Sequence, residues 1–163
     1  MHAASCAGSC RVVPWSRCFV RCATAVCVTL LGIFAVSPGA TAALRITDDR
    51  GGNIGAYWSR FSAVRDSNEP VIIDGKCSSA CTLILGLVPS RRICVTKNAV
   101  LGFHAAWRPG FLGLPVINAP ATRTLLSSYP PAIRQWIARN GGLTDKMLYL
   151  SGRDLLALYR ECR

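Results

Sequence analysis

The sequence has little negative charge and few histidines. Its 163 residues include 8 acidic residues against 19 basic ones, and only 2 histidines. It has no lysine-rich run and no nucleic-acid-binding motif, so the excess of arginine predicts a solvated basic surface and no nucleic-acid partner. No Cys-x-x-Cys and no pair of neighbouring histidines completes a zinc site. We therefore expect neither a metal nor another cofactor.

Residues 1–42 have the order of a secretory signal peptide. Three arginines precede an uncharged apolar stretch at 23–36, and small residues follow, so we expect cleavage after Ala42 or Ala43. An uncleaved membrane anchor is the alternative. The stretch has 14 residues, fewer than the ~20 that a membrane-spanning helix needs. The mature protein is therefore expected in the periplasm or outside the cell, with membrane contact only through an uncleaved leader.

The remaining residues, 43–163, have the length of one small domain. They carry 16 basic and 8 acidic residues, because the leader takes 3 of the 19 basic ones, which gives a net charge of 16 − 8 = +8. Five of the nine cysteines lie in the leader. An even number of cysteines in an exported domain predicts two disulfides, with three alternative pairings, while free thiols and a metal site are weaker alternatives. The four are Cys77, Cys81, Cys94 and Cys162.

One disulfide is expected to join the segment around residue 79 to a distant part of the chain. Cys94 lies on the next predicted strand, and Cys162 lies near the C-terminus. Both could reach the helix that carries Cys81. We therefore predict at least one bridge from Cys77 or Cys81 to Cys94 or Cys162.

Strand and helix patterns alternate along the domain. They predict an α/β layered fold with a mainly parallel sheet and flanking helices. A turn is predicted at Asp74-Gly75, a mobile loop at 105–118, and a capping box at Ser151-x-x-Asp154 that opens the last helix. The predicted strands are 44–47, 71–73, 92–95 and 99–103, and the predicted helices are 53–64, 79–87, 121–128, 132–139 and 151–161.

The segment Val71–Leu87 is the most informative about function. A hydroxyl side chain, Ser78 or Ser79, lies where a buried strand turns into a helix. The free N–H groups of a helix start can stabilise a developing oxyanion. His104 follows the next apolar strand and is the only histidine outside the leader. A serine at a helix start is also a common N-cap, and a lone histidine is often structural.

A reactive serine needs a general base near neutral pH. His104 is the only imidazole available, and the alternatives are Lys76 and Lys97. No Gly-x-Ser-x-Gly elbow is present. Beyond His104, three apolar side chains could line a substrate cleft or pack in the core. They are Trp107, Phe111 and Leu112.

Three patches together resemble the proteolytic subunit of Clp protease, within the Clp/crotonase fold, and the small exported Clp-like proteins of bacteria. They are Gly51-Gly52, Gly75-Lys-Cys-Ser-Ser-Ala-Cys81 and Phe103-His104. The resemblance implies that Ser79 is the nucleophile, that His104 is the base, and that the N–H groups of Gly52 and Ala80 hold the oxyanion. The third member of a Ser-His-Asp triad would be Asp145, with Asp154 a poorer alternative.

These patterns predict an exported serine hydrolase, most directly a peptidase that acts without ATP on peptides or unfolded proteins. The rival hypothesis is a non-catalytic binding or assembly module on the same scaffold. Self-association into a homo-oligomer is expected in either case, because the resemblance implies a fold that builds trimers and rings.

Overall fold

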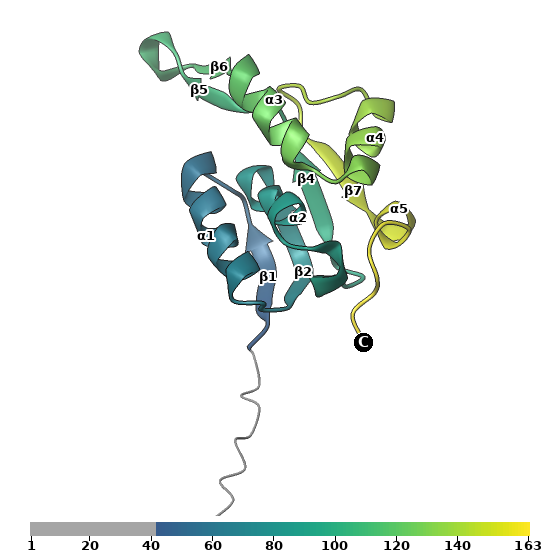
Figure 1. Cartoon of the computed structure of the whole chain (residues 1–163). Coiled ribbons are helices and arrows are strands. Elements are labelled where there is room, and N and C mark those ends of the chain that lie inside the picture. Colours follow the sequence, from purple (N-terminus) through teal and green to yellow (C-terminus); the bar gives the residue numbers. More distant parts are fainter. Residues whose placement is uncertain (1–41) are drawn as a thin grey trace, which may run out of the picture. The chain divides into compact units, whose positions relative to one another are not determined.

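A five-stranded sheet forms the centre of the domain in the computed structural model, which describes residues 42–163 (Figure 1). The central strand is β2, which pairs with β1 on one side. On its other side it pairs with β3 near its start and with β4 near its end, and all three pairings are parallel. β7 runs antiparallel to β4. The strands are β1 (Leu44–Asp49), β2 (Val71–Ser78), β3 (Ile93–Val95), β4 (Val100–Phe103) and β7 (Leu148–Ser151). The prediction of a small, mainly parallel α/β domain is confirmed.

Helices flank the sheet close to the predicted positions. α1 begins where Asn53 accepts a hydrogen bond from the Ala56 N–H at 3.0 Å. α5 is shorter than predicted, and Ser151 makes no side-chain capping bond, so the capping box does not form. The helical segments are α1 (Ile54–Asp66), η1 (Ser79–Leu83), α2 (Ile84–Leu87), η2 (Ser90–Arg92), α3 (Ala119–Ser128), α4 (Pro131–Arg139) and α5 (Gly152–Leu156).

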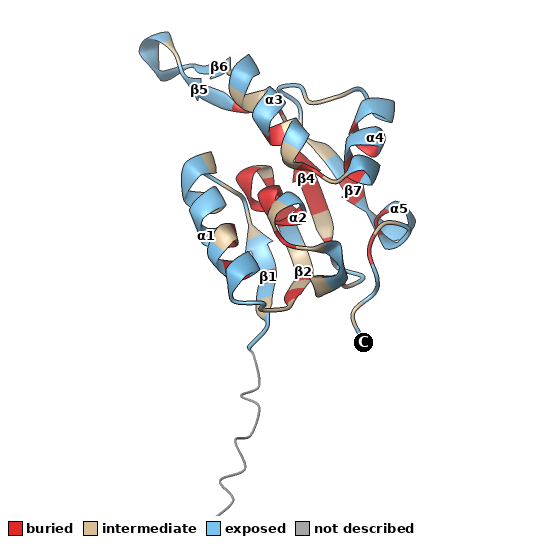
Figure 2. Ribbon diagram, in the orientation of Figure 1, coloured by how far each residue is buried: buried red, intermediate tan, exposed pale blue. Residues whose placement is uncertain are grey.

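The buried core lies between the sheet and its helices. Figure 2 shows the buried residues concentrated on β4, η1 and the inner faces of the helices. Phe103 on β4 packs edge-to-face on Tyr129, with ring centroids 5.4 Å apart. No helix within residues 42–163 is long and apolar enough to cross a membrane. The signal-peptide prediction concerns residues 1–42, which lie outside the described residues except for Ala42.

β2 does not end at Asp74-Gly75, so the predicted turn is wrong. The strand continues to Ser78, and the register between β1 and β2 shifts between Ile46 and Asp48. A Cβ atom at Gly75 would lie 1.8 Å from the Thr47 carbonyl oxygen. Glycine at this position therefore serves the close approach of two strands and not a turn. The longer strand carries the chain directly to Ser79.

Residues 105–118 form a β-hairpin where a loop was predicted. Its strands are β5 (Trp107–Pro109) and β6 (Pro115–Ile117), joined by η3 (Phe111–Gly113). Figure 1 shows this hairpin extending away from the main sheet. Phe111 and Leu112 at its tip are 85% and 83% exposed. They do not pack in the core, and neither lines the two hollows described below, whereas Trp107 lines both.

The four described cysteines form two disulfides, but not in the expected combination. Cys77 pairs with Cys81, and Cys94 pairs with Cys162. Cys94 lies opposite Ile72 in the sheet. Cys77 lies five residues further along β2, which is roughly 16 Å in an extended strand. This separation excludes the predicted bridge from Cys77 to Cys94.

Candidate active site

Ser79 lies at the junction between β2 and η1, in a conformation that is uncommon for a residue other than glycine. Its φ angle is +56°, in the left-handed region. Ser78 occupies the N-cap position and makes no side-chain capping bond. The Ser79 hydroxyl is therefore not used as a helix cap. Left-handed residues held by their surroundings cluster at functional sites.

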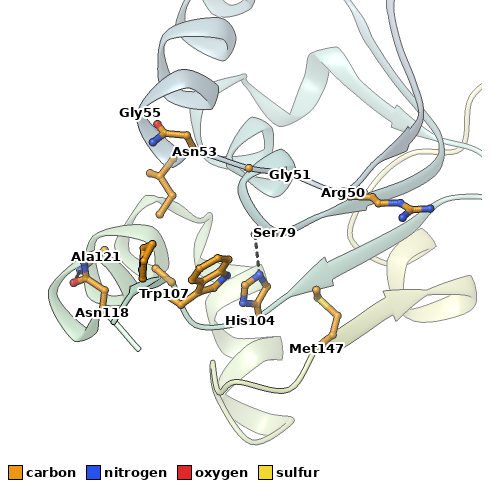
Figure 3. Close-up of a pocket in the computed structure, with 14 residues that line it drawn as sticks. Arg50, Gly51, Asn53, Gly55, Ser79, His104, Trp107, Asn118, Ala121 and Met147 are labelled. Atoms are coloured by element: carbon orange, nitrogen blue, oxygen red, sulfur yellow. Dashed lines mark hydrogen bonds between the residues drawn. The ribbon is translucent and has the colours of Figure 1, made fainter. Parts of the chain in front are cut away.

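The Ser79 hydroxyl contacts His104. Its Oγ lies 2.8 Å from the His104 Nε2, and the dashed line in Figure 3 marks this hydrogen bond. His104 directly follows β4, the parallel neighbour of β2. Both side chains are half-buried. The ends of two adjacent parallel strands thus bring together residues that are 25 positions apart in the sequence.

The structure separates Ser79 from the other residues considered for the same chemistry. Ser78 is buried beside Gly102, where an added Cβ would lie 2.6 Å from the Ser78 Oγ. The Lys76 ammonium lies 6.0 Å from the centroid of the Tyr149 ring. Neither Lys76 nor Lys97 lines the cleft that contains Ser79. His104 is therefore the base that the geometry offers to Ser79.

Ser79 and His104 lie in an open cleft of about 690 Å³. Figure 3 shows Trp107 and Met147 beside His104, and Asn53 and Arg50 on the segment that faces Ser79. The cleft therefore combines apolar walls with polar groups. Its lining residues are Arg50, Gly51, Gly52, Asn53, Ile54, Gly55, Ser79, His104, Ala106, Trp107, Pro109, Asn118, Ala121 and Met147.

Gly51 packs directly on the elbow that carries Ser79. Its φ angle is +79°, and a Cβ atom there would lie 2.7 Å from the Ala80 nitrogen. The Gly51 N–H is already used, because it donates to Asp49 Oδ1 at 2.9 Å. The Gly52 N–H donates no hydrogen bond within the described residues. Ala80 lies in the first turn of η1, where N–H groups lack intrahelical acceptors. Gly52 lines the cleft with an unbonded N–H group, whereas Ala80 is 1% exposed and does not line the cleft.

Asp49 holds the Gly51-Gly52 segment in place and was missed in the sequence. Its carboxylate accepts from the Gly51 N–H, from the Tyr57 hydroxyl and from Arg60 Nη1, the last at 3.2 Å. Burial, and then the hydrogen bond to Asp49, raises the pKa of Tyr57 to about 12. Tyr57 therefore stays protonated and keeps donating to Asp49. An aspartate two residues before glycine is a turn signal that could have identified this role.

A buried hydroxyl pair holds the other side of the elbow and gave no signal in the sequence. Thr82 donates to the Ser79 carbonyl oxygen at 2.7 Å, and its oxygen lies 2.6 Å from the Tyr129 hydroxyl. Since Thr82 has one hydroxyl proton, Tyr129 is the donor between the two. Burial raises the pKa of Tyr129 well above its ordinary value. The Tyr129–Thr82 chain thus fixes the backbone on which Ser79 is mounted.

Asp145 lies near His104 but is not hydrogen-bonded to it. Both residues line a second hollow of about 430 Å³, adjacent to the first. A backbone hydrogen bond of 2.7 Å from Ala105 to Thr144 keeps the two segments together. Asp154 lies in the first turn of α5 and lines neither hollow. Of the two hydrogen bonds in a Ser-His-Asp triad, the described residues make the one between serine and histidine and not the one between histidine and a carboxylate.

Within residues 42–163 no group of three His, Cys, Asp or Glu side chains could hold a metal ion. Cys77 and Cys81, considered as a pair of metal ligands, are cross-linked to each other. They are therefore not available as thiolates.

No protein-family model and no curated protein matches the sequence. Among solved structures, the chain is similar to a single-site mutant of ClpP1 from Listeria monocytogenes. The two are 14% identical over 76% of this chain and 77% of that chain, with a TM-score of 0.43. Such values do not establish membership of a family. The chemistry of the site is therefore judged from its own geometry.

Proposed function

We propose that this protein is an exported serine hydrolase whose most direct activity is the ATP-independent hydrolysis of peptides. The observation that carries the proposal is the 2.8 Å contact between Ser79 Oγ and His104 Nε2 in an open cleft. A hydroxyl hydrogen-bonded to an imidazole is the arrangement that activates serine as a nucleophile.

The reaction begins with the attack of Ser79 Oγ on a substrate carbonyl carbon. His104 Nε2 takes the hydroxyl proton as the bond forms. The carbonyl oxygen becomes an oxyanion, and the proposal assigns the N–H groups of Gly52 and Ala80 to bind it. His104 then gives the proton to the leaving amine, which leaves an acyl group on Ser79. His104 takes a proton from a water molecule as the water oxygen attacks the acyl carbon. It then gives this proton to Ser79 Oγ as the bond to Oγ breaks, which releases the carboxylic acid and the free serine.

Asp145 is assigned a minor role in this proposal. It shares a hollow with His104 but makes no hydrogen bond to the ring. Without that hydrogen bond, Asp145 does not fix the tautomer of the imidazole as a bonded aspartate does. The working pair is therefore Ser79 and His104.

Two features support export to the periplasm or the medium. The leader pattern at 1–42 precedes β1, and Ala42 and Ala43 are exposed, so cleavage there would leave the fold intact. The two disulfides suit an oxidising compartment. ATP is lacking outside the cytoplasm, which is why we propose direct action on peptides or unfolded proteins.

Self-association is also proposed, and the hairpin at 107–117 supports it. Six of its apolar side chains are at least 43% exposed, and contiguous exposed apolar surface marks interaction sites. Replacement of Phe111 and Leu112 by serine should then lower the oligomeric state in analytical ultracentrifugation. An unchanged sedimentation coefficient would show that the hairpin tip has no part in assembly.

A non-catalytic binding or assembly module is the second candidate. The observation in its favour is the absence of a carboxylate hydrogen-bonded to His104 among the described residues. This module would bind peptides in the same cleft without cleaving them. Binding of a peptide that is recovered intact would favour it.

The proposal is tested by a double-mutant cycle with the purified protein. Hydrolysis of peptide and ester substrates should fall to background in Ser79→Ala, in His104→Ala and in the double variant. The double variant should be hardly slower than either single variant, because residues that act as a unit are non-additive. Ser78→Ala is the control and should keep most activity. Full activity in Ser79→Ala would refute the mechanism.

A further inference from the structure

The Cys77–Cys81 disulfide encloses Ser79. Cys77 is the next-to-last residue of β2, Cys81 is the third residue of η1, and the bridge joins cysteines four positions apart. Ser79 lies at the centre of this loop. Both cysteines are 0% exposed. The bridge therefore forms the buried base of the elbow from which the Ser79 hydroxyl reaches His104.

Ser79 needs such a constraint because its backbone is in the left-handed region, with φ of +56°. A side chain with a Cβ disfavours this region, so the conformation persists only when the surroundings impose it. The Thr82 hydroxyl holds the Ser79 carbonyl from one side. The disulfide fixes the residues on both sides of Ser79 covalently.

The Cys77–Cys81 bridge is expected to add little to the stability of the whole fold. A disulfide restricts the unfolded chain more strongly when it closes a longer loop. The Cys94–Cys162 bridge spans 68 positions, whereas Cys77–Cys81 spans 4. The short bridge therefore restricts the unfolded chain less than the long one does. It nevertheless encloses Ser79, whose backbone is in the left-handed region.

We propose that the Cys77–Cys81 disulfide positions the nucleophile, so that the hydrolase becomes fully active only after this bridge has formed. The inference rests on the proposed function. The bridge forms when the two thiols give up two electrons and two protons to a small-molecule disulfide such as oxidised glutathione, which becomes two thiols. Cys77 and Cys81 are positioning residues, since neither contacts the substrate.

The first test compares two double variants, each of which lacks one bridge. In Cys77→Ala/Cys81→Ala, kcat and the rate of fluorophosphonate labelling should fall roughly a hundredfold with little change in KM, the cost typical of a nucleophile displaced by about 1 Å. Cys94→Ala/Cys162→Ala is the matched control. It should lose more thermal stability and yet keep kcat within about twofold. Equal kcat in the two folded variants would overturn the proposal.

A redox titration covers the case in which the first variant does not fold. In Cys94→Ala/Cys162→Ala protein, Cys77–Cys81 is the only remaining bridge within 43–163. Dithiothreitol opens it by exchange, giving two protein thiols and the cyclic disulfide of the reagent. Labelling should fall in step with the thiols counted by alkylation and mass spectrometry, and should return on reoxidation. Full labelling of protein with both thiols free would contradict the proposal.

One further readout separates this inference from the proposed function. His104 carries the only imidazole in residues 43–163, so its NMR resonances report the contact with Ser79 without any turnover. Opening the bridge should move these resonances toward those of Ser79→Ala. If wild-type protein is never labelled, the proposed function fails, and this shift alone judges the positioning role. Unmoved resonances in the opened protein would overturn it.

Discussion

Gly51 offers a sharp test of the contact between the glycine segment and the elbow. A methyl group at this position would lie 2.5 Å from the Ser78 carbonyl oxygen and 2.7 Å from both the Ala80 nitrogen and the Ser79 Cβ. These are mostly backbone atoms, which cannot rotate away. Gly51→Ala should therefore push the glycine segment and the elbow apart, and with them the two proposed oxyanion donors.

Gly142 supplies a matched control. Its φ is +77°, close to the +79° of Gly51, but a methyl group there meets nothing within 4 Å. Alanine at either position costs about 1–2 kcal/mol for its left-handed backbone. Overpacking adds about 1–3 kcal/mol, and only Gly51→Ala incurs it. Gly51→Ala should thus lower the free energy of unfolding by ~2–5 kcal/mol, against ~1–2 kcal/mol for Gly142→Ala.

Urea unfolding measures these losses, and the rate of fluorophosphonate labelling measures the effect on the site. A displacement of about 1 Å at the elbow should slow labelling by roughly a hundredfold in Gly51→Ala. Gly142→Ala should be labelled at the wild-type rate. If the two variants lose equal stability and equal labelling, Gly51 does not pack on the elbow as described.

Three further outcomes are expected. Asp49→Asn should slow hydrolysis, because it weakens the hydrogen bond that holds the Gly51 N–H. Asp48→Asn is the control and should not slow it, since the Asp48 carboxylate has only a 3.9 Å contact to a mostly exposed arginine. Equal rates for the two variants in steady-state kinetics would show that Asp49 does not support the site. Asp145→Asn should reduce kcat far less than His104→Ala, and an equal loss would make Asp145 a full member of a triad. Burial raises the pKa of Tyr159 to about 12, so the folded state holds this proton more tightly than the unfolded state. The free energy of unfolding should therefore fall as the pH rises from about 10 to about 12. Urea titrations at a series of pH values should show a smaller fall in Tyr159→Phe.

The sequence predicted the elements that depend on local patterns. The segment 79–87 is helical as expected, and α1 begins at its asparagine cap. Features that depend on distant neighbours were missed. Gly75 follows Asp74 as it would in a turn, but its role is set by the Thr47 carbonyl on another strand. Local turn chemistry could not reveal that contact.

In the candidate site, too, some residues could be predicted from the sequence and others could not. The resemblance to the Clp subunit assigned the nucleophile to Ser79, and His104 is the only imidazole in residues 43–163. The supporting contacts could not be predicted, because Tyr129 reaches Thr82 from 47 positions away. The predicted disulfide pairing was wrong for a related reason. Strand order decides which cysteines meet, and the sequence did not show that β3 pairs with the start of β2 while Cys77 lies near its end.

The most direct test of the central claim is to treat the purified wild-type protein with a fluorophosphonate probe and to map the modified residue by mass spectrometry. The proposed mechanism predicts one adduct, on the peptide that contains Ser79, at a rate that depends on His104 and is lost in Ser79→Ala. An adduct on another serine, or no adduct in protein whose two disulfides are intact, would contradict it.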